Sequence, residues 1–182
     1  MRKKLLFVSL SLFLFLFINC ENQPSLQTYF VEKMEDPSFL IVNLPFQLEN
    51  IFDKTLTEED MKTIASVGKL NLLVYRPKDG EQELLDNELQ TIQNILDNNR
   101  YQHLMDFKTF DKGLGSFMFE GETDQVEEGI VIVSIQDNGF GVLRILGSEI
   151  NPVALSKLIK KVSPSLLKKE ISSSSSGLKN LF

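Results

Sequence analysis

Residues 130–146 read IVIVSIQDNGFGVLRIL, which is two apolar runs separated by a polar turn. The turn, Asp137-Asn138-Gly139, favours a tight hairpin, because Asn and Gly adopt the positive φ angles that such turns need. The runs on either side, Ile130–Gln136 and Phe140–Leu146, have strand length, and a third strand is predicted at Ser116–Glu120. These three strands are expected to pair antiparallel in one sheet.

Segments on both sides of the hairpin complete the predicted fold. Apolar runs of strand length occur at Phe39–Leu44 and Leu70–Tyr75. Other segments carry apolar residues at helical spacing or helix-start residues. We predict helices around Leu26–Phe30, from a capping box at Thr57 and Asp60 to Gly68, over Glu81–Asp97 with a further turn or two near Tyr101, and from Asn151 and Pro152 to Val162.

This order of elements predicts an α+β domain, written (α)βαβαβββα. We expect a mixed, mainly antiparallel five-stranded sheet packed with three to five helices. Because a helix separates the first two strands, they are expected to run parallel through a right-handed crossover.

Two of the predicted strands are apolar at consecutive positions, at Phe39–Val42 and Ile130–Val133. Successive side chains of a strand point to opposite faces of the sheet, so both faces need cover. Helices are expected to supply it, with Leu26–Phe30 on the second face. The alternative is that part of one face is an apolar binding surface.

Residues 1–20 have the layout of a bacterial signal peptide. Arg2-Lys3-Lys4 precedes an apolar run from Leu5 to Ile18, which is shorter than the roughly 20 residues of a membrane-spanning helix. Phe17-Ile18-Asn19-Cys20 resembles a lipobox, in which the cysteine takes a diacylglycerol and the chain is cut before it. We expect lipidation at Cys20. The alternative is an uncleaved signal anchor with an idle thiol.

Cleavage before Cys20 would leave 163 residues with 16 basic and 25 acidic side chains, so the net charge would change from −6 to −9. This acidic balance disfavours nucleic-acid binding. We expect a signal peptide at 1–19, a lipidated tether at 20–25, one domain at 26–164 and a Lys/Ser-rich flexible tail at 165–182. Within that tail, residues 177–182 either dock back on the domain or stay loose.

Few residues offer catalytic or metal-binding chemistry. His103 is the only histidine, and Cys20, the only cysteine, is the predicted lipidation site. No Gly-x-Ser-x-Gly motif accompanies them, so we expect no Ser-His-Asp triad, no zinc site and no cofactor. Glycines at Gly113–Gly115 and Gly139–Gly141 precede predicted strands, and we expect them to shape turns rather than to bind phosphate.

Clusters of acids and of lysines are the remaining candidates. The acids lie at Asp124, Glu127 and Glu128 and at Glu58-Glu59-Asp60. Neither cluster has the spacing of a calcium-binding EF-hand, and we interpret both as solvated charges of a turn and a helix start. The lysines of the last helix and the residues after it either face water or touch anionic lipid. They are Lys157, Lys160, Lys161, Lys168 and Lys169.

Several short motifs follow one another over Pro24–Lys160. In this order they resemble a family of small lipoproteins from Bacteroidetes-type bacteria, whose shared region is known only as a domain of unknown function, DUF4252. The resemblance implies no catalytic residue. The motifs are the lipobox cysteine, Ser25-Leu26-Gln27 with Tyr29, the strand Phe39–Leu44, Leu56-Thr57-Glu58-Glu59, the strand Leu70–Tyr75, and Leu146-Gly147 followed by Asn151-Pro152.

We therefore expect a cell-envelope protein anchored to the inner or outer membrane through acylated Cys20, with its domain in the periplasm or at the cell surface. The first functional hypothesis is a non-catalytic binding, assembly or signalling module that takes an envelope protein or peptide, for example as an added strand at a sheet edge. One alternative is a carboxylate-dependent envelope hydrolase that uses Asp124, Glu127 or Glu128. Another is a membrane-surface protein led by its lysine-bearing helix.

Overall fold

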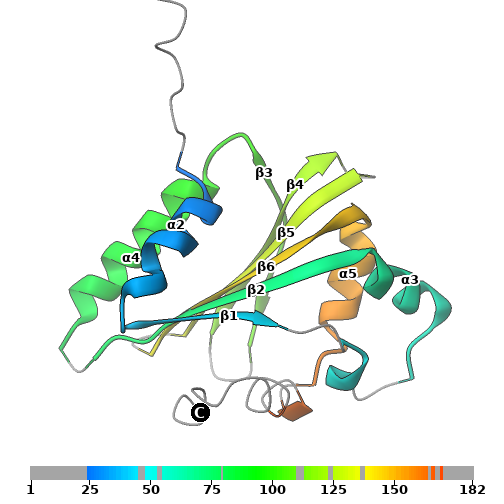
Figure 1. Cartoon of the computed structure of the whole chain (residues 1–182), viewed down its shortest axis with the longest axis horizontal. Helices are drawn as coiled ribbons and strands as arrows, with labels where there is room; N and C mark the ends of the chain where they lie inside the picture. Colours follow the sequence, from blue (N-terminus) through cyan, green and yellow to red (C-terminus); the bar gives the residue numbers. More distant parts are fainter. Residues whose placement is uncertain are drawn as a thin grey trace, which may run out of the picture.

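The computed structural model describes residues 24–44, 48–52, 55–78, 80–109, 113–122, 125–135, 138–163, 165–166 and 169. The predicted signal peptide, Cys20 and most of the predicted tail, including residues 177–182, lie outside these ranges. Within them the predicted α+β class is confirmed (Figure 1).

Four α-helices occur in the described ranges, and three of them start at a side-chain cap. Ser25 caps α2 and Asn151 caps α5, each through its side-chain oxygen, and Thr57 forms the predicted capping box with Asp60 at the start of α3. Each cap satisfies backbone N–H groups of the first turn. The helices are α2 (Leu26–Glu32), α3 (Glu58–Ser66), α4 (Gln82–Leu96) and α5 (Pro152–Ile159), with 3-10 turns η2 (Lys33–Glu35) and η3 (Leu48–Ile51).

Six strands form one sheet in the order β1-β2-β6-β5-β4-β3, with every neighbouring pair antiparallel. The predicted hairpin is present as β5 and β6, and β4 pairs with it as expected. Because β6 and β5 are the central strands, the stretch 130–146 forms the middle of the sheet. The strands are β1 (Phe39–Leu44), β2 (Val67–Tyr75), β3 (Tyr101–Lys108), β4 (Leu114–Glu122), β5 (Gln125–Ile135) and β6 (Gly139–Ile150).

Two predictions about the sheet are wrong. The strands β1 and β2 are antiparallel, not parallel. Since α3 ends at Ser66 and β2 begins at Val67, the chain turns round the end of the sheet instead of crossing back over a face (Figure 1). The segment beginning at Tyr101 is a strand rather than a helical turn, so the sheet has six strands and not five. Its pairing with β4 outweighs the helix-like spacing of its apolar residues.

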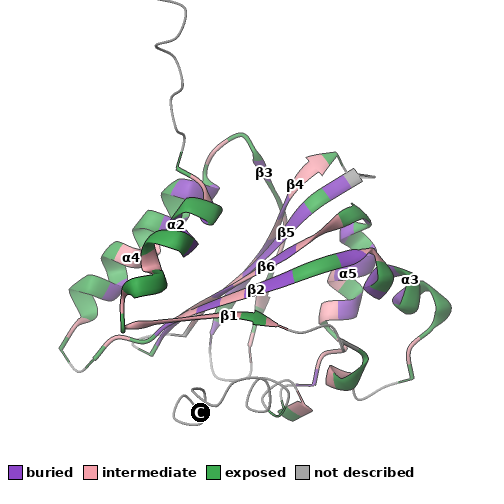
Figure 2. Cartoon of the chain, viewed as in Figure 1, coloured by how far each residue is buried: buried purple, intermediate pink, exposed green. Residues whose placement is uncertain are grey.

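Helices pack on both faces of the sheet, as the apolar strands predict. On one face α2 and α4 bury a core that includes Leu26 and Ile92 against Leu73 of β2. On the other face Leu155 of α5 packs with a second core that includes Ile145, and α3 lies against α5. Figure 1 shows the two helix pairs at opposite ends of the strands, and Figure 2 shows that their sheet-facing sides are buried. Each pair therefore covers only part of its face.

Polar contacts hold α2 on α4. The Tyr29 hydroxyl donates to Glu88 Oε2 at 2.7 Å, and Lys33 Nζ forms an ion pair with Glu88 Oε1 at 2.5 Å. Burial of Tyr29, together with the Glu88 carboxylate, raises the pKa of its hydroxyl above the ordinary value. The first described helix is thus fixed to the domain by side-chain contacts.

Candidate functional site

Neighbouring strands lose their regular pairing at one end of the sheet. The register between β2 and β6 shifts at Gly68, and the registers of β5 with both of its neighbours shift at Glu127. Opposite Glu127, β6 has the three residues Gly147, Ser148 and Glu149. Extra residues of this kind bend a strand and redirect its side chains, and they are common beside functional sites.

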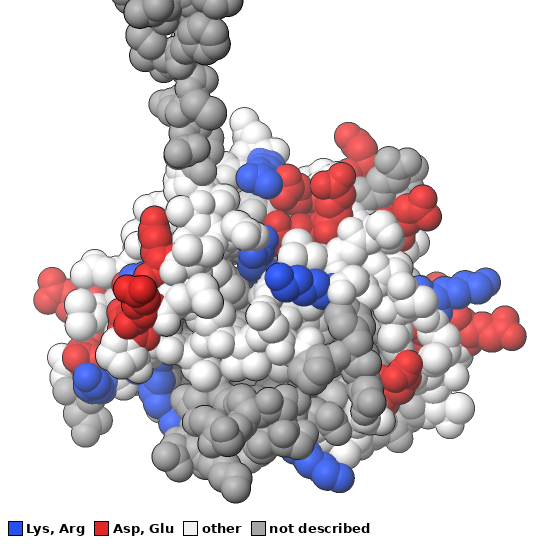
Figure 3. Space-filling model, in the orientation of Figure 1, with Lys and Arg blue, Asp and Glu red and all other residues white. Residues whose placement is uncertain are grey.

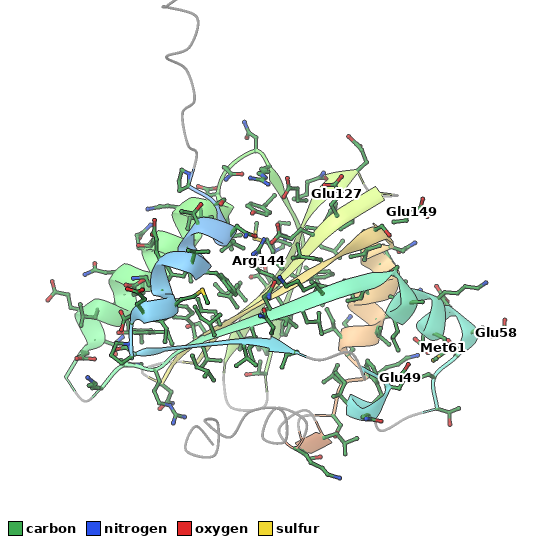
Figure 4. The ribbon with its side chains drawn as sticks, viewed as in Figure 1. Glu49, Glu58, Met61, Glu127, Arg144 and Glu149 are labelled. Carbon is green, nitrogen blue, oxygen red and sulfur yellow. The ribbon has the colours of Figure 1, made fainter. Side chains whose placement is uncertain are left out.

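An open hollow of about 520 Å³ lies among these irregular strand ends. Its lining has four carboxylates and one guanidinium, so the hollow is acidic. Figure 3 shows acidic side chains grouped near the ends of β4 and β5, and Figure 4 shows Glu127 and Glu149 at the ends of β5 and β6. The lining residues are Arg100, Glu120, Glu127, Glu128, Leu146, Gly147, Ser148 and Glu149.

A buried ion pair lies at the inner side of the hollow. Arg144 Nε donates to Glu128 Oε1 at 2.5 Å, and both side chains are only 7% exposed. Arg144 Nη1 also donates to Gln27 Oε1 of α2 at 3.2 Å, and its guanidinium lies 5.5 Å from the centre of the Phe30 ring. These contacts hold the Glu128 carboxylate in one position and join it to α2.

The outer side of the hollow combines paired and unpaired acids. Arg100 Nε donates to Glu120 Oε1 at 2.5 Å, and this hydrogen bond raises the pKa of the Arg100 guanidinium. The Arg100 side chain is half-exposed. Among the residues that the structure describes, Glu127 and Glu149 have no ion-pair partner, and both are exposed. Two carboxylates are therefore open to a ligand.

The backbone at the edge of the hollow is unusual at two positions. Glu149 has a φ of 55°, the left-handed region that glycine prefers, and it is the one non-glycine residue of the described chain with a positive φ. A Cβ at Gly147 would lie 2.1 Å from the carbonyl oxygen of Ser66, at the end of α3. Glycine is therefore required at 147, whereas at 149 the chain keeps an acid where glycine would be less strained.

The predicted acids divide between two places. Glu127 and Glu128 line the same hollow, while Asp124 lies outside the described residues. Glu58 and Glu59 are exposed in the first turn of α3. Asp60 completes the capping box and accepts from Lys161 Nζ at 2.5 Å, which, with the Thr57 hydrogen bonds, lowers its pKa to about 2. The α3 acids thus lie at a helix start, as interpreted, but Asp60 is buried and paired rather than solvated.

His103 lies in a strand, where a helix was predicted, and it does not form a triad. Its ring Nε2 lies 2.8 Å from Asp106 Oδ1, and the Ser116 hydroxyl donates to the same oxygen at 2.6 Å. A catalytic triad places the histidine between serine and acid. Here the carboxylate is in the middle, so the three side chains form a surface hydrogen-bond group.

The lysines of α5 are not one free basic surface. Lys157 and Lys160 are exposed, but Lys161 is paired with Asp60, and Lys168 lies outside the described residues.

The glycine of the hairpin turn behaves as predicted, since Gly139 has a φ of 114° and a Cβ there would lie 2.1 Å from the carbonyl oxygen of Tyr75.

The described ranges contain neither a metal-ion cluster nor a membrane-spanning helix. No group of three His, Cys, Asp or Glu side chains there is arranged to hold a metal ion. No helix in those ranges is long and apolar enough to cross a membrane.

The chain matches the model of a known protein family. The model of a domain of unknown function, DUF4252, matches residues 29–158. The chain belongs to this family. No curated protein and no solved structure matches the chain.

The structure explains two motifs of this DUF4252 chain in physical terms. Leu146-Gly147 places the glycine that the end of α3 requires, and Asn151-Pro152 supplies the cap and first residue of α5. The DUF4252 match spans every element from β1 to β6, and all residues lining the acidic hollow lie inside it.

Sequence reasoning missed half of the hollow. Arg144 is the single charge in the apolar strand segment 142–146, and such a residue signals a buried ion pair when its strand is central. Arg100 and Glu120 carry no comparable local signal, because the hydrogen bond between them joins residues 20 positions apart.

Proposed function

We propose that this DUF4252 chain is a lipid-anchored cell-envelope protein whose acidic hollow binds a basic segment of another envelope protein. The observation that carries the proposal is a pair of exposed carboxylates, Glu127 and Glu149, which have no ion-pair partner among the described residues and lie beside a buried ion pair. Fixed charges of one sign attract and orient a partner of the opposite sign. A Lys- or Arg-containing segment fits this chemistry.

The position of the hollow suits a tether at Cys20. Gln27 accepts a hydrogen bond from Arg144 at the inner side of the hollow and follows Cys20 by seven residues. Seven extended residues span at most about 25 Å. A diacylglycerol at Cys20 would keep the hollow close to the membrane surface, so a membrane-associated partner is the one proposed.

The pairing of two of the four acids with arginine favours binding over catalysis. Hydrolysis by two carboxyl groups needs one that gives up a proton and one that stays ionised. Glu128 accepts a hydrogen bond from Arg144 and Glu120 accepts one from Arg100, so each carboxylate already has a cationic partner. Both are therefore better suited to shaping the hollow than to donating a proton.

Photo-crosslinking in cells tests the binding role. The full chain carries a photo-crosslinking residue in place of Ser148, and we expect it to capture a distinct partner. The Glu127→Gln/Glu149→Gln variant should lose this product, whereas the control Glu83→Gln, an exposed acid on α4, should retain it. Equal capture by both variants, or no distinct partner at all, would refute the proposal.

Lipidation is tested separately. A labelled fatty acid supplied to cells should appear on the wild-type chain and be absent from Cys20→Ser. If the wild-type chain takes up no label, the lipid anchor is refuted. The binding role of the acidic hollow is then tested by the crosslinking experiment alone.

A carboxylate-dependent hydrolase is the second candidate, because Glu127 and Glu128 meet in one hollow with two further acids. In that case the purified chain would cleave envelope glycans or esters, and Glu127→Gln would abolish cleavage. Activity that survives Glu127→Gln, or the absence of activity in the wild-type chain, would exclude this candidate.

A further inference from the structure

Four aliphatic side chains lie together on the sheet face that carries α3 and α5. Leu40 and Val42 of β1 pair in register with Val74 and Leu72 of β2. On β2, Leu72 and Val74 flank Leu73, whose side chain lies in the core under α2 and α4. Because successive side chains of a strand point to opposite faces, Leu72 and Val74 and their partners on β1 point to the other face of the sheet. We call Leu40, Val42, Leu72 and Val74 the aliphatic patch.

The aliphatic patch lies beyond the cover that α5 provides. Its four side chains are half-buried, and none is part of either apolar core formed by the described residues. Leu70 precedes Leu72 by two residues, so it lies on the same face, and it is buried in the core with Leu155 of α5. Figure 2 shows that β1 is of intermediate burial over most of its length.

Gly141 leaves a notch beside the aliphatic patch. It pairs with Val74, and among the described residues a Cβ at this position would have only the Leu73 carbonyl oxygen within 4 Å, at 3.8 Å. Gly115 lies in the same row two strands away, and there the ring of Phe107 already occupies the space that a Cβ would need. The first glycine is open where the second is covered by an aromatic ring, so the notch can take a bulky apolar side chain.

The residues just after α5 lie close to the segment that follows β1. Val162 pairs with Phe52, and the Ser163 N–H donates to the Ile51 carbonyl oxygen at 2.8 Å. Ile51 ends η3, which follows β1, and Figure 1 shows η3 and the end of α5 below the tip of that strand. The strands β1, β2 and β6 together are only about 10 Å wide.

Residues 170–182 have the length and composition of a linker with an apolar end. Five serines at 172–176 are followed by Gly177-Leu178-Lys179-Asn180-Leu181-Phe182. Serine and glycine make flexible linkers. Thirteen extended residues reach about 43 Å, several times the width of the patch.

We propose that residues 177–182 dock on the aliphatic patch and place an apolar side chain in the notch at Gly141. The serine run supplies the reach, and Leu178, Leu181 and Phe182 supply the apolar surface. Docking removes both surfaces from water. The patch is then a surface that this chain covers itself.

The test places a photo-crosslinking phenylalanine analogue at Phe182 in the full chain, purified in detergent. We expect crosslinks within one chain to peptides that contain 39–44 or 67–75. The same analogue at Ser174, in the serine run, is the matched control and should give much less of these products.

The variant Gly141→Val fills the notch with a residue that strands favour, and we expect loss of the crosslink from position 182 while circular dichroism stays unchanged. Crosslinks that map to other parts of the domain, that join two chains, or that persist in Gly141→Val would overturn the proposal. A product that joins two chains would identify a second copy as the occupant.

Discussion

The ion pair between Arg144 and Glu128 allows a quantitative prediction about stability. Arg144→Met keeps much of the side-chain volume but removes the partner of a carboxylate that is 7% exposed. It also removes the hydrogen bond to Gln27 and the guanidinium beside Phe30. Breaking a buried pair on one side costs about 3–5 kcal/mol, because a charge stays buried without compensation. We expect the free energy of unfolding to fall by this amount.

Most of that cost belongs to the stranded carboxylate, so removing both charges should recover it. Apolar residues of similar volume often replace a buried ion pair with a change of about 1 kcal/mol or with a gain. The double variant Arg144→Met/Glu128→Leu is therefore expected to be more stable than Arg144→Met alone. The wild-type chain, Arg144→Met, Glu128→Leu and the double variant together form a double-mutant cycle.

Urea unfolding followed by far-UV circular dichroism measures the cycle. In heat, each kcal/mol shifts Tm by about 2–4 °C for a domain of this size, so Arg144→Met should lower Tm by about 10 °C. The control Arg100→Met breaks the half-exposed pair with Glu120 and should cost less than about 1 kcal/mol. A cost below about 1 kcal/mol for Arg144→Met, or a double variant no more stable than it, would refute the reasoning.

Three further predictions concern single residues. Glu149→Gly should raise the free energy of unfolding by about 1 kcal/mol in urea, because it relieves a left-handed backbone, and a decrease would contradict that explanation. The pKa of Asp60 is lowered to about 2 by Lys161, so the contribution of this carboxylate to stability is present above pH 3.8 and is lost as the pH falls toward 2. Asp60→Asn should therefore flatten the pH dependence of Tm between pH 3.8 and 2. An unchanged pH profile would exclude the pairing. Gly147→Ala should cost about 1–3 kcal/mol in urea, because its Cβ would collide with the Ser66 carbonyl oxygen, and a neutral result would mean that α3 moves freely there.

The central part of the fold could be predicted because its signals are local. The turn Asp137-Asn138-Gly139 and the apolar runs beside it predict the β5–β6 hairpin without reference to the rest of the chain. The direction of β1 relative to β2 is not local, since the intervening chain can either cross a face or turn round an end. The strand at Tyr101 was missed for a related reason, because its pairing with β4 comes from tertiary structure.

The candidate site divides in the same way. Glu127 and Glu128 were noticed as neighbouring acids, but the hollow arises from register shifts between strands, which only the assembled sheet reveals. Glu149 became notable through its backbone angle rather than its type. Arg144 alone had a usable sequence signal, as a lone charge in an apolar central strand.

The attachments of α2 also determine how the molecule bears mechanical load. A pull on the N-terminal lead enters at α2, and side chains pass it to Glu88 on α4 and to Arg144 on β6. The force is thus divided between a long helix, a central strand and, along the backbone through η2, the edge strand β1. Under tension the side-chain contacts of α2 would break before the hydrogen-bonded strands separate, and the contact between Gln27 and Arg144 beside the acidic hollow would be lost with them.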